Sequence, residues 1–370
     1  MAVKIGVAKE TAGGERRVAL TPETCGKLVK AGAEVTVERG IGRGAHFTDD
    51  AYAAAGAKLV DDAAAALGDA DLVFCVQPPE PSRIALMKPG AALIGGVQPE
   101  AEAGRAEALR QRDILTFPLE RLPRTTRAQA MDILSSQAGM AGYKATLIAA
   151  ELAPRFFPML TTAAGTIRPS KVLIVGAGVA GLQAIATAKR LGAQVEGFDV
   201  RPETREQIES LGGRFLDLGV SAAGEGGYAR ALTDDERAEQ QRRLGEHLKN
   251  VDVIVCTAAV PGRPAPKIIS AAMVEAMKPG SVIVDLAAET GGNCALTVPG
   301  QTIETEGGVS VAGPLGLASM GALHASEMYA RNVFNFASLL LKDGALAFDW
   351  DDELLARTAW PPREAATPAG

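Results

Sequence analysis

Short apolar runs separated by amphipathic segments make up most of the chain. In the first third, strands are predicted at KIGVA (4–8), EVTVE (34–38), LVFCV (72–76), AALIGG (91–96) and ILTFP (near 114). The spacing of apolar positions between these runs predicts helices at about 22–31 and 49–55. Strands that alternate with helices indicate a parallel sheet covered on both faces.

The same alternation resumes after residue 170. Strands are predicted at 171–175, 194–198, from 214, and at 251–256, 281–286 and 308–313, with helices from 202, at 234–248 and from 270. The stretch SAAGEGGY at 221–228 lacks an apolar pattern and favours a flexible connection. The segment 324–341 has the spacing of a buried helix and is expected to return to the first domain, whereas the tail from 351 is expected to be mobile.

The apolar run that begins at Lys171 leads directly into GAGVAG, then into a helix and a second strand followed by Asp199. Gly176 permits a tight turn, Gly178 lets backbone approach a pyrophosphate, and Gly181 lets the helix pack closely on the strand. The helix N-terminus then offers unpaired N–H groups to phosphates. Asp199 lies 199 − 176 = 23 residues after the first glycine, where a carboxylate accepts ribose hydroxyls and repels a 2′-phosphate. The arrangement predicts an NAD(H) site.

Between the two alternating regions, the segment from Ala128 to Leu152 has few helix breakers and predicts one long helix. We therefore expect two Rossmann-like α/β domains with parallel sheets, separated by a cleft and joined by long helices. The N-terminal domain is expected to comprise residues 1–130 plus about 320–370. The NAD(H)-binding domain is expected at 131–319.

Composition narrows the class of protein. With 370 residues, the chain is long enough for two cores, and its 47% hydrophobic and 4% aromatic content indicates that they are aliphatic. A net charge of −6 with scattered basic residues argues against nucleic acid as a partner. The four cysteines are far apart, so no metal site and no disulfide framework is expected. We find neither a signal-peptide pattern nor an apolar run of the ~18 residues that span a bilayer.

Four segments carry a family resemblance: KIGVAKETAGGERRVALTPE, VERGIGRGAHFTDDAYAAAGA, the glycine turn and SVIVDLAAETGGN. They are similar to a family that contains alanine dehydrogenase and the NAD(H)-binding component (domain I, or alpha-1 subunit) of proton-translocating transhydrogenase. The resemblance extends over about residues 2–340. It implies the two-domain fold expected above.

The alanine dehydrogenase branch reduces a keto acid, which requires a proton donor and a carbonyl polariser beside the hydride. Similar sequences supply a Lys in a KVKEP-like segment and a His in a YLH-like segment. Here CVQPP places Cys75 where the Lys would be, LIGGVQPE contributes no His at 91–100, and the acid of a VDVAIDQGG-like segment becomes Glu289. The histidines, His46, His247 and His324, lie elsewhere and are expected to be surface or structural residues. The carbonyl-reducing residues are therefore absent from these segments.

The transhydrogenase branch has a mark of its own. PRTTRAQAMDILSSQ at 123–137 closely matches a PRISRAQSMDILSSQ-like stretch in that family, where an Arg, a Gln, an Asp and a Ser hold the nicotinamide. The matching positions are Arg124, Gln129, Asp132 and Ser135. On the residues alone, the segment also fits a helix N-terminus with ordinary polar capping; the resemblance favours the nicotinamide role.

The resemblance implies further contacts with the cofactor. Val179 and Ala180 would lie at the phosphates, and Asp199, Val200 and Arg201 would surround the adenosine. The glycine-rich stretch becomes a mobile loop that closes over NAD(H). The other implied contacts are Thr125, Thr126, Arg127, Gly227, Tyr228, Thr257 and Ala258.

Hydride transfer between two nicotinamides moves no proton at the reacting carbons, so it requires orientation and exclusion of water rather than an acid. Because the chain ends near residue 370 without a membrane helix, it resembles the separate alpha-1 type. The resemblance implies that it passes hydride from NADH to NADP⁺ on a partner subunit, while a membrane partner translocates protons. It also implies a cytoplasmic homodimer, peripheral on the membrane through its partners. Two alternatives stay open: an amino-acid dehydrogenase with an unusual active site, and an NAD sensor without catalysis.

Overall fold

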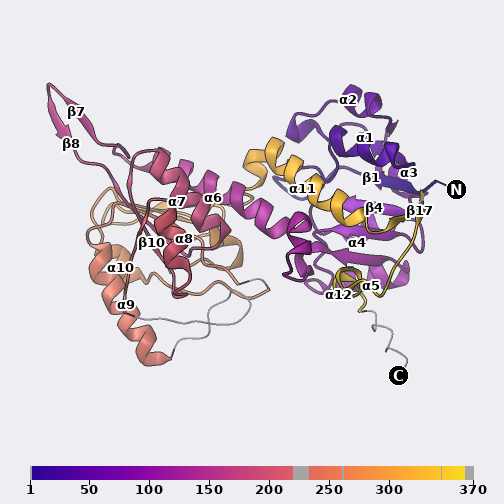
Figure 1. Ribbon diagram of the computed structural model, residues 1–370. Coiled ribbons are helices and arrows are strands. Elements are labelled where there is room, and N and C mark those ends of the chain that lie inside the picture. The colour runs from indigo at the N-terminus through magenta and orange to yellow at the C-terminus, as the bar shows by residue number, and fades with distance from the viewer. Residues whose placement is uncertain (1, 220–232, 261, 343, 363–370) are drawn as a thin grey trace. The chain divides into compact units, whose positions relative to one another are not determined.

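Two separate β-sheets organise the chain, one in each of two units (Figure 1). Unit 1 comprises Met1–Gln137 and Ser319–Gly370, and unit 2 comprises Ala138–Ala318. The computed structural model describes residues 2–219, 233–260, 262–342 and 344–362. The chain therefore leaves unit 1 once and returns to it once.

The sheet of unit 1 has six parallel strands in the order β3-β2-β1-β4-β5-β6. Its strands are β1 Lys4–Val7, β2 Glu34–Glu38, β3 Lys58–Val60, β4 Leu72–Cys75, β5 Ala92–Gly95 and β6 Leu115–Pro118. β4 and β5 are buried along their whole length, because helices cover both faces of a parallel sheet. The sequence predicted five of these strands and missed β3, which has three residues and little buried surface.

Helices of unit 1 begin where the sequence offers a cap. Thr21 forms a capping box with Thr24 at the start of α1, and Pro22 occupies the first helical position. The late helix α11 lies among the first elements of the chain (Figure 1) and packs against α1. The helices and 3₁₀ turns of unit 1 are α1 Pro22–Lys30, η1 Arg43–Ala45, α2 Asp49–Ala54, α3 Ala63–Leu67, α4 Pro81–Ile84, α5 Ala103–Gln111, η2 Leu119–Arg121, η3 Arg127–Met131, η5 Ser319–Gly321, α11 Ala322–Ala337 and α12 Glu353–Thr358.

The C-terminal tail is ordered as far as the structure describes it, which corrects the expectation of a mobile tail from 351. The helix α12 buries Leu354 and Leu355, and the Trp360 side chain is 2% exposed. Trp360 exchanges two backbone hydrogen bonds of 3.0 and 2.8 Å with Thr116 on the edge strand β6. These apolar side chains make the tail part of the core, although Pro and Ala dominate its end. A two-stranded ribbon, β16 Leu341–Lys342 with β17 Ala345–Leu346, precedes it.

The predicted long helix exists but begins later than expected. Residues Arg127–Met131 form the 3₁₀ turn η3, Asp132 has an extended backbone (φ −76°, ψ 96°), and the helix α6 spans Ile133–Leu152. The Asp132 carboxylate accepts a 2.9 Å hydrogen bond from the Ser135 N–H. An aspartate that satisfies a free N–H of the first turn ends the preceding turn and starts a new helix.

Unit 2 contains a seven-stranded sheet in the order β11-β10-β9-β12-β13-β15-β14. Its strands are β9 Lys171–Val175, β10 Gln194–Phe198, β11 Arg214–Phe215, β12 Val253–Cys256, β13 Val282–Asp285, β14 Thr302–Glu304 and β15 Ser310–Ala312. β14 pairs antiparallel with β15, so this sheet is mixed rather than wholly parallel as expected. Gly308, at φ +73°, supports the short connection that antiparallel neighbours permit.

The other elements of unit 2 are α7 Val179–Arg190, α8 Thr204–Ser210, α9 Asp234–Leu248, α10 Ala271–Glu275, η4 Leu286–Thr290 and the hairpin of β7 Leu160–Thr162 with β8 Gly165–Ile167. The predicted helix at 234–248 coincides with α9. The hairpin was not predicted, and all six of its strand residues are exposed. No helix within the described ranges combines the length and apolarity that a bilayer crossing requires.

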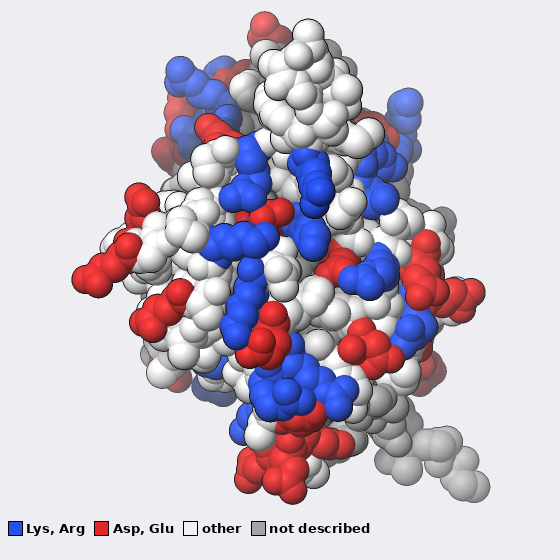
Figure 2. Space-filling model, turned by 90° about the vertical axis from the view of Figure 1, so that its left-hand side faces the viewer, with Lys and Arg blue, Asp and Glu red and all other residues white. Residues whose placement is uncertain are grey.

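Charges on unit 2 are interspersed. Figure 2 shows basic and acidic side chains mixed over one face of the molecule, and the uncharged β7–β8 hairpin projects from it. Arg155 and Lys278 both contact Asp252, at 2.6 and 3.3 Å. Pairing of this kind matches the scattered basic residues of the sequence. The four cysteines are buried and free.

Candidate functional site

The glycine turn between β9 and α7 depends on two glycines that no larger residue could replace without a clash. Gly176 has φ +95°, in the left-handed region, and a Cβ there would lie 2.9 Å from both Thr257 Oγ1 and Ala258 N. A Cβ on Gly181 would lie 1.8 Å from the Gly176 carbonyl oxygen. The chain thus turns sharply after β9, and the first turn of α7 packs directly on it.

The third glycine of the turn faces open space. A Cβ on Gly178 would meet no atom within 4 Å, and Val179, the next residue, is 46% exposed. Among the described residues, no side chain caps the start of α7. Its first N–H groups therefore stay available, and such a helix N-terminus attracts an anion. On the other side of the turn, α6 approaches so closely that a Cβ on Gly142 would lie 2.0 Å from the Ala180 carbonyl oxygen.

Asp199, immediately after β10, is saturated with hydrogen bonds. Its Oδ2 accepts from Ala177 N (2.7 Å) and Arg201 Nη2 (2.7 Å), and its Oδ1 accepts from the backbone N (3.0 Å) and Nε (2.9 Å) of Arg201. Burial acts to raise the pKa of this carboxyl, but the bonds from Arg201 and Ala177 outweigh it and lower the pKa. A carboxylate has about four lone-pair positions. A ribose diol therefore needs the Arg201 guanidinium to give up its bonds.

Thr257 and Ala258 follow β12 and meet the glycine turn. Thr257 Oγ1 donates to the Gly176 carbonyl at 2.9 Å. Ala258 exchanges hydrogen bonds with the fully buried Asn293, whose Oδ1 accepts at 3.0 Å and whose Nδ2 donates at 2.7 Å. Asn293 was not predicted as a site residue. It lies in the TGGN stretch that carried the family resemblance, which was the signal available in the sequence.

The segment from Arg124 to Ser135 lies in unit 1. Its 3₁₀ turn exposes Gln129, and the Asp132 carboxylate accepts from both N (2.9 Å) and Oγ (2.5 Å) of Ser135. The structure brings these two predicted residues together as a helix cap. Arg124 and Thr126 are exposed, whereas the Thr125 hydroxyl is buried without a hydrogen-bond partner among the described residues.

Three predicted cofactor contacts have a different status. The Arg127 guanidinium is engaged by the Asp352 carboxylate in two bonds of 2.8 and 2.5 Å. Asp352 also caps α12 through Leu354 N at 2.9 Å, so this pair ties η3 to the C-terminal helix. Gly227 and Tyr228 lie outside the described residues.

Cys75, at the position where a dehydrogenase-like Lys was sought, offers no proton donor of suitable acidity. Its side chain is buried between the carbonyls of Ile94 and Gly96, at 3.9 and 3.8 Å from Sγ. Burial, followed by the nearby Glu10, raises the pKa of the thiol well above its usual range. His46 and His324 are exposed, and His247 contacts Glu196 on unit 2.

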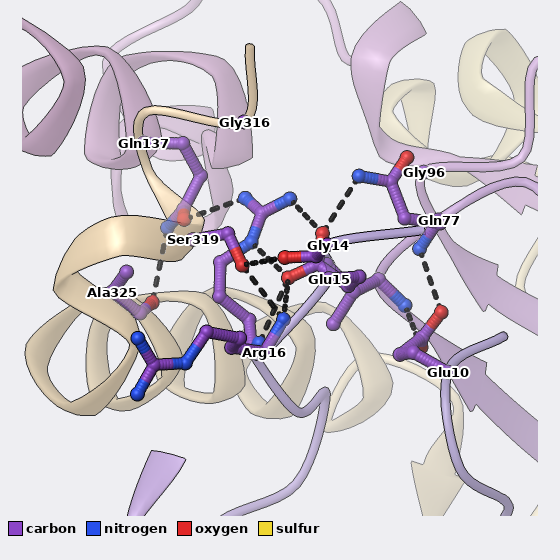
Figure 3. A network of polar contacts seen from close by, with 12 residues as sticks. Glu10, Gly14, Glu15, Arg16, Gln77, Gly96, Gln137, Gly316, Ser319 and Ala325 are labelled. Atoms are coloured by element: carbon purple, nitrogen blue, oxygen red, sulfur yellow. Dashed lines mark hydrogen bonds and ion pairs between the residues drawn. The ribbon is translucent and has the colours of Figure 1, made fainter. Parts of the chain in front are cut away.

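Charged groups near Cys75 satisfy one another (Figure 3). Glu10 accepts from the backbone N–H of Val76 at 2.6 Å and of Gln77 at 3.2 Å. Arg17 donates to Glu15 at 2.6 Å, and Gln77 Nε2 donates to the same carboxylate at 2.7 Å. Burial raises the pKa of Glu10 to about 7. For Glu15, burial also acts upward, but Arg17 and Gln77 outweigh it and lower the pKa to about 2.

Family models match nearly the whole chain. A model described as "Alanine dehydrogenase/PNT, N-terminal domain" matches residues 6–141, and one described as "Alanine dehydrogenase/PNT, C-terminal domain" matches residues 145–361. The N-terminal model thus covers the sheet of unit 1, and the C-terminal model covers unit 2 together with α11 and α12.

Individual relatives separate the two branches. An NAD(P) transhydrogenase alpha subunit of Rhodospirillum rubrum is 47% identical over 90% of this chain and 89% of its own length. The crystal structure of transhydrogenase from Sinorhizobium meliloti superposes with a TM-score of 0.87 at 41% identity, over 96% of this chain and 97% of that one. Alanine dehydrogenase of Bacillus subtilis is 29% identical over 78% of this chain and 71% of its own. This chain therefore belongs to the alanine dehydrogenase/PNT family, in which it is more similar to transhydrogenase alpha subunits than to alanine dehydrogenases.

Proposed function

We propose that this chain holds NAD(H) at the glycine turn and passes hydride between it and NADP(H) bound on a partner subunit. The chain is a transhydrogenase alpha-type subunit by its similarity to relatives 42–47% identical. One observation supports the hydride chemistry above all others: a dinucleotide-binding turn occurs in a chain whose Cys75 thiol is buried and held neutral. Such a protein can bind the cofactor but has no acid there for reducing a carbonyl.

The residues present fit NAD(H). The open space at Gly178 and the uncapped start of α7 suit a pyrophosphate. The low pKa of Asp199 keeps it ionised, which suits a ribose diol and opposes a 2′-phosphate. In unit 1, the buried and unpartnered Thr125 hydroxyl fits a polar group supplied by a ligand. We assign the phosphates to Gly176, Gly178, Val179, Ala180 and Gly181, and the adenosine to Asp199, Val200 and Arg201.

The residues of this chain bind and orient rather than exchange protons. When bound, the nicotinamide supplies and accepts the hydride. Gln129 is exposed on η3 and can donate and accept hydrogen bonds toward amide or ribose groups, while Asp132 and Ser135 fix the backbone next to it. Correct orientation of two reactants is itself worth several powers of ten in rate. Asp199 receives the ribose when Arg201 releases its two side-chain donors.

The partners follow from the same reading. The Rhodospirillum rubrum relative is named as an alpha subunit, which implies an assembly with other subunits. For this chain we propose an NADP(H)-binding partner and a membrane partner that translocates protons. We also propose that the chain forms a homodimer and sits on the cytoplasmic side of the membrane through these partners, without metal or nucleic acid.

Reconstitution tests this function. The purified chain mixed with an NADP(H)-binding transhydrogenase partner should transfer hydride from NADH to an NADP⁺ analogue. Absence of transfer would favour an NAD sensor, and steady oxidation of NADH by the chain alone with pyruvate and ammonia would favour an amino-acid dehydrogenase. Substitution Gln129→Asn should abolish most turnover while the Kd for NADH changes little; unaltered turnover would remove Gln129 from the mechanism.

A further inference from the structure

Asn332, on α11, holds the segment that carries Gln129, Asp132 and Ser135. Its side chain is 8% exposed. Asn332 Nδ2 donates to the Ala130 carbonyl at 2.9 Å, and Asn332 Oδ1 accepts from Ser136 Oγ at 2.7 Å. One buried amide thus contacts residues on both sides of Asp132.

The backbone between these two contacts is where η3 ends and α6 begins. Asp132 interrupts the helical geometry with ψ 96°, and its N–H reaches the Gln129 carbonyl only at 3.4 Å. Local hydrogen bonds therefore restrain the angle between η3 and α6 weakly. Asn332 restrains it because Ala130 belongs to η3 and Ser136 belongs to α6.

Other contacts hold the ends of the segment rather than its middle. Arg127 is paired with Asp352 before the break, and Gln137 Nε2 donates to the Ala325 carbonyl at 3.1 Å after it. Asn335 Nδ2 also donates to the Ala130 carbonyl, at 2.9 Å, but this side chain is exposed. In water a hydrogen bond contributes less than the same bond under burial.

We propose that Asn332 is a positioning residue for hydride transfer: it sets the geometry of the nicotinamide-holding segment without touching the cofactor. This inference rests on the function proposed above for Gln129, Asp132 and Ser135. A shift of about 1 Å in such a segment lowers the rate by about a hundredfold when orientation limits the reaction. The adenosine and phosphate contacts lie in unit 2, so the affinity for NADH is expected to survive.

Substitution Asn332→Asp is the direct test. It keeps the size of the side chain and the acceptor for Ser136, but it replaces the donor to the Ala130 carbonyl with a second acceptor. In the chain reconstituted with its NADP(H)-binding partner, kcat for hydride transfer should fall about tenfold or more, while the Kd for NADH stays within about threefold. With NADH deuterated at the transferred position, the kinetic isotope effect should rise, because the hydride step becomes slower than product release.

Two controls separate positioning from stability. Val333→Ala removes buried surface from the neighbouring position of α11, and Asn335→Asp alters the exposed donor to the same carbonyl. Both should lower kcat by less than about threefold at a temperature where all variants are folded. If Val333→Ala lowers kcat as much as Asn332→Asp at equal loss of melting temperature, or if Asn332→Asp transfers hydride at the normal rate, the positioning role is wrong.

A second variant covers the case in which Asn332→Asp fails to fold. Ser136→Ala removes the hydroxyl that Asn332 Oδ1 accepts, and it should give the same pattern of lower kcat and raised isotope effect. Failure of the proposed function has a different signature: the unmodified chain would then transfer no hydride in the reconstituted complex. Normal transfer by the unmodified chain and by both variants would overturn the positioning role alone.

Discussion

The two sheets have the same strand order over their first five positions, yet their carboxyl edges differ. In each, the order reverses between the first strand of the unit and the fourth, where ligands of such sheets bind. In unit 1 this place is crossed by Glu10, which follows β1 and accepts from Val76 and Gln77 after β4. In unit 2 the glycine turn follows β9 instead. One unit fills the position with a carboxylate of its own, and the other leaves backbone N–H groups for an anion.

An acid at the end of the second strand is common to both units. Glu38 accepts from Lys9 N at 2.9 Å, and Asp199 accepts from Ala177 N at 2.7 Å. The acid therefore has a structural role in both units, since it binds the backbone that follows the first strand. The following helix makes the difference: Thr21 caps α1, whereas Gly178 leaves α7 uncapped by any described side chain. The comparison teaches that the glycine turn, more than the acid, distinguishes the nucleotide site.

The largest expected effect concerns Glu10. Its pKa is raised from 4.5 to about 7, so the folded state holds this proton more tightly than the unfolded state does. The stability that this carboxyl contributes is complete below pH 4.5 and is lost as pH rises through 7. At about 1.4 kcal/mol per pH unit, the loss is ~3 kcal/mol. Urea unfolding at pH 5 and pH 8 should show this loss in the unmodified chain and not in Glu10→Gln.

The Kd for NADH provides the control for that prediction. It should be the same for Glu10→Gln and the unmodified chain at both pH values, because Glu10 belongs to unit 1 and the glycine turn to unit 2. A change in the Kd that follows the protonation of Glu10 would contradict the view that unit 1 has filled its own position.

Gly178→Ala tests the open side of the glycine turn. The backbone at this residue (φ −79°, ψ −170°) accepts alanine, and a Cβ there meets no atom of the chain, so the melting temperature should stay within about 2 °C. The added methyl should keep the pyrophosphate from the N–H groups of α7 and weaken NADH binding about a hundredfold in a fluorescence titration.

The matched change in the same turn is Gly181→Ala, whose Cβ would lie 1.8 Å from a carbonyl oxygen. It should lower stability itself, because the turn and the helix must separate. Loss of stability in Gly178→Ala, or normal NADH affinity in that variant, would mean that the pyrophosphate does not approach at Gly178.

The smallest effect compares the two acids. Asp199→Asn should weaken NADH binding about tenfold, since a neutral amide accepts the ribose hydroxyls less strongly than a carboxylate. Glu38→Gln, the corresponding change in unit 1, should leave the Kd unchanged. Equal affinities for NADH in the unmodified chain and Asp199→Asn would assign Asp199 the structural role that Glu38 has, and isothermal titration of both variants distinguishes the cases.

The sequence predicted elements well where apolar period and caps agree. The strands at 34–38, 171–175 and 194–198 and the helix at 234–248 have the bounds that were expected. β3, β7, β8 and β14 were missed because each has three residues, too few to show a period. The start of α6 was misplaced because a run of good helix formers concealed the cap at Asp132. The fold of the tail depended on the burial of Trp360 against β6, which composition does not reveal.

By itself, the sequence determined the two α/β units, the glycine turn and the absence of a Lys or His acid from the segments that supply one in alanine dehydrogenases, because these depend on local period and on single residue types. Only the tertiary structure decided which polar groups meet. Asn332 reaches Ala130, Arg127 pairs with Asp352, and Arg201 saturates Asp199. The first two contacts join residues about 200 positions apart, whose proximity results from the packing of α11 and α12 on unit 1. The third depends on a rotamer, so in all three cases hydrogen-bond geometry, rather than residue type, selects the partner.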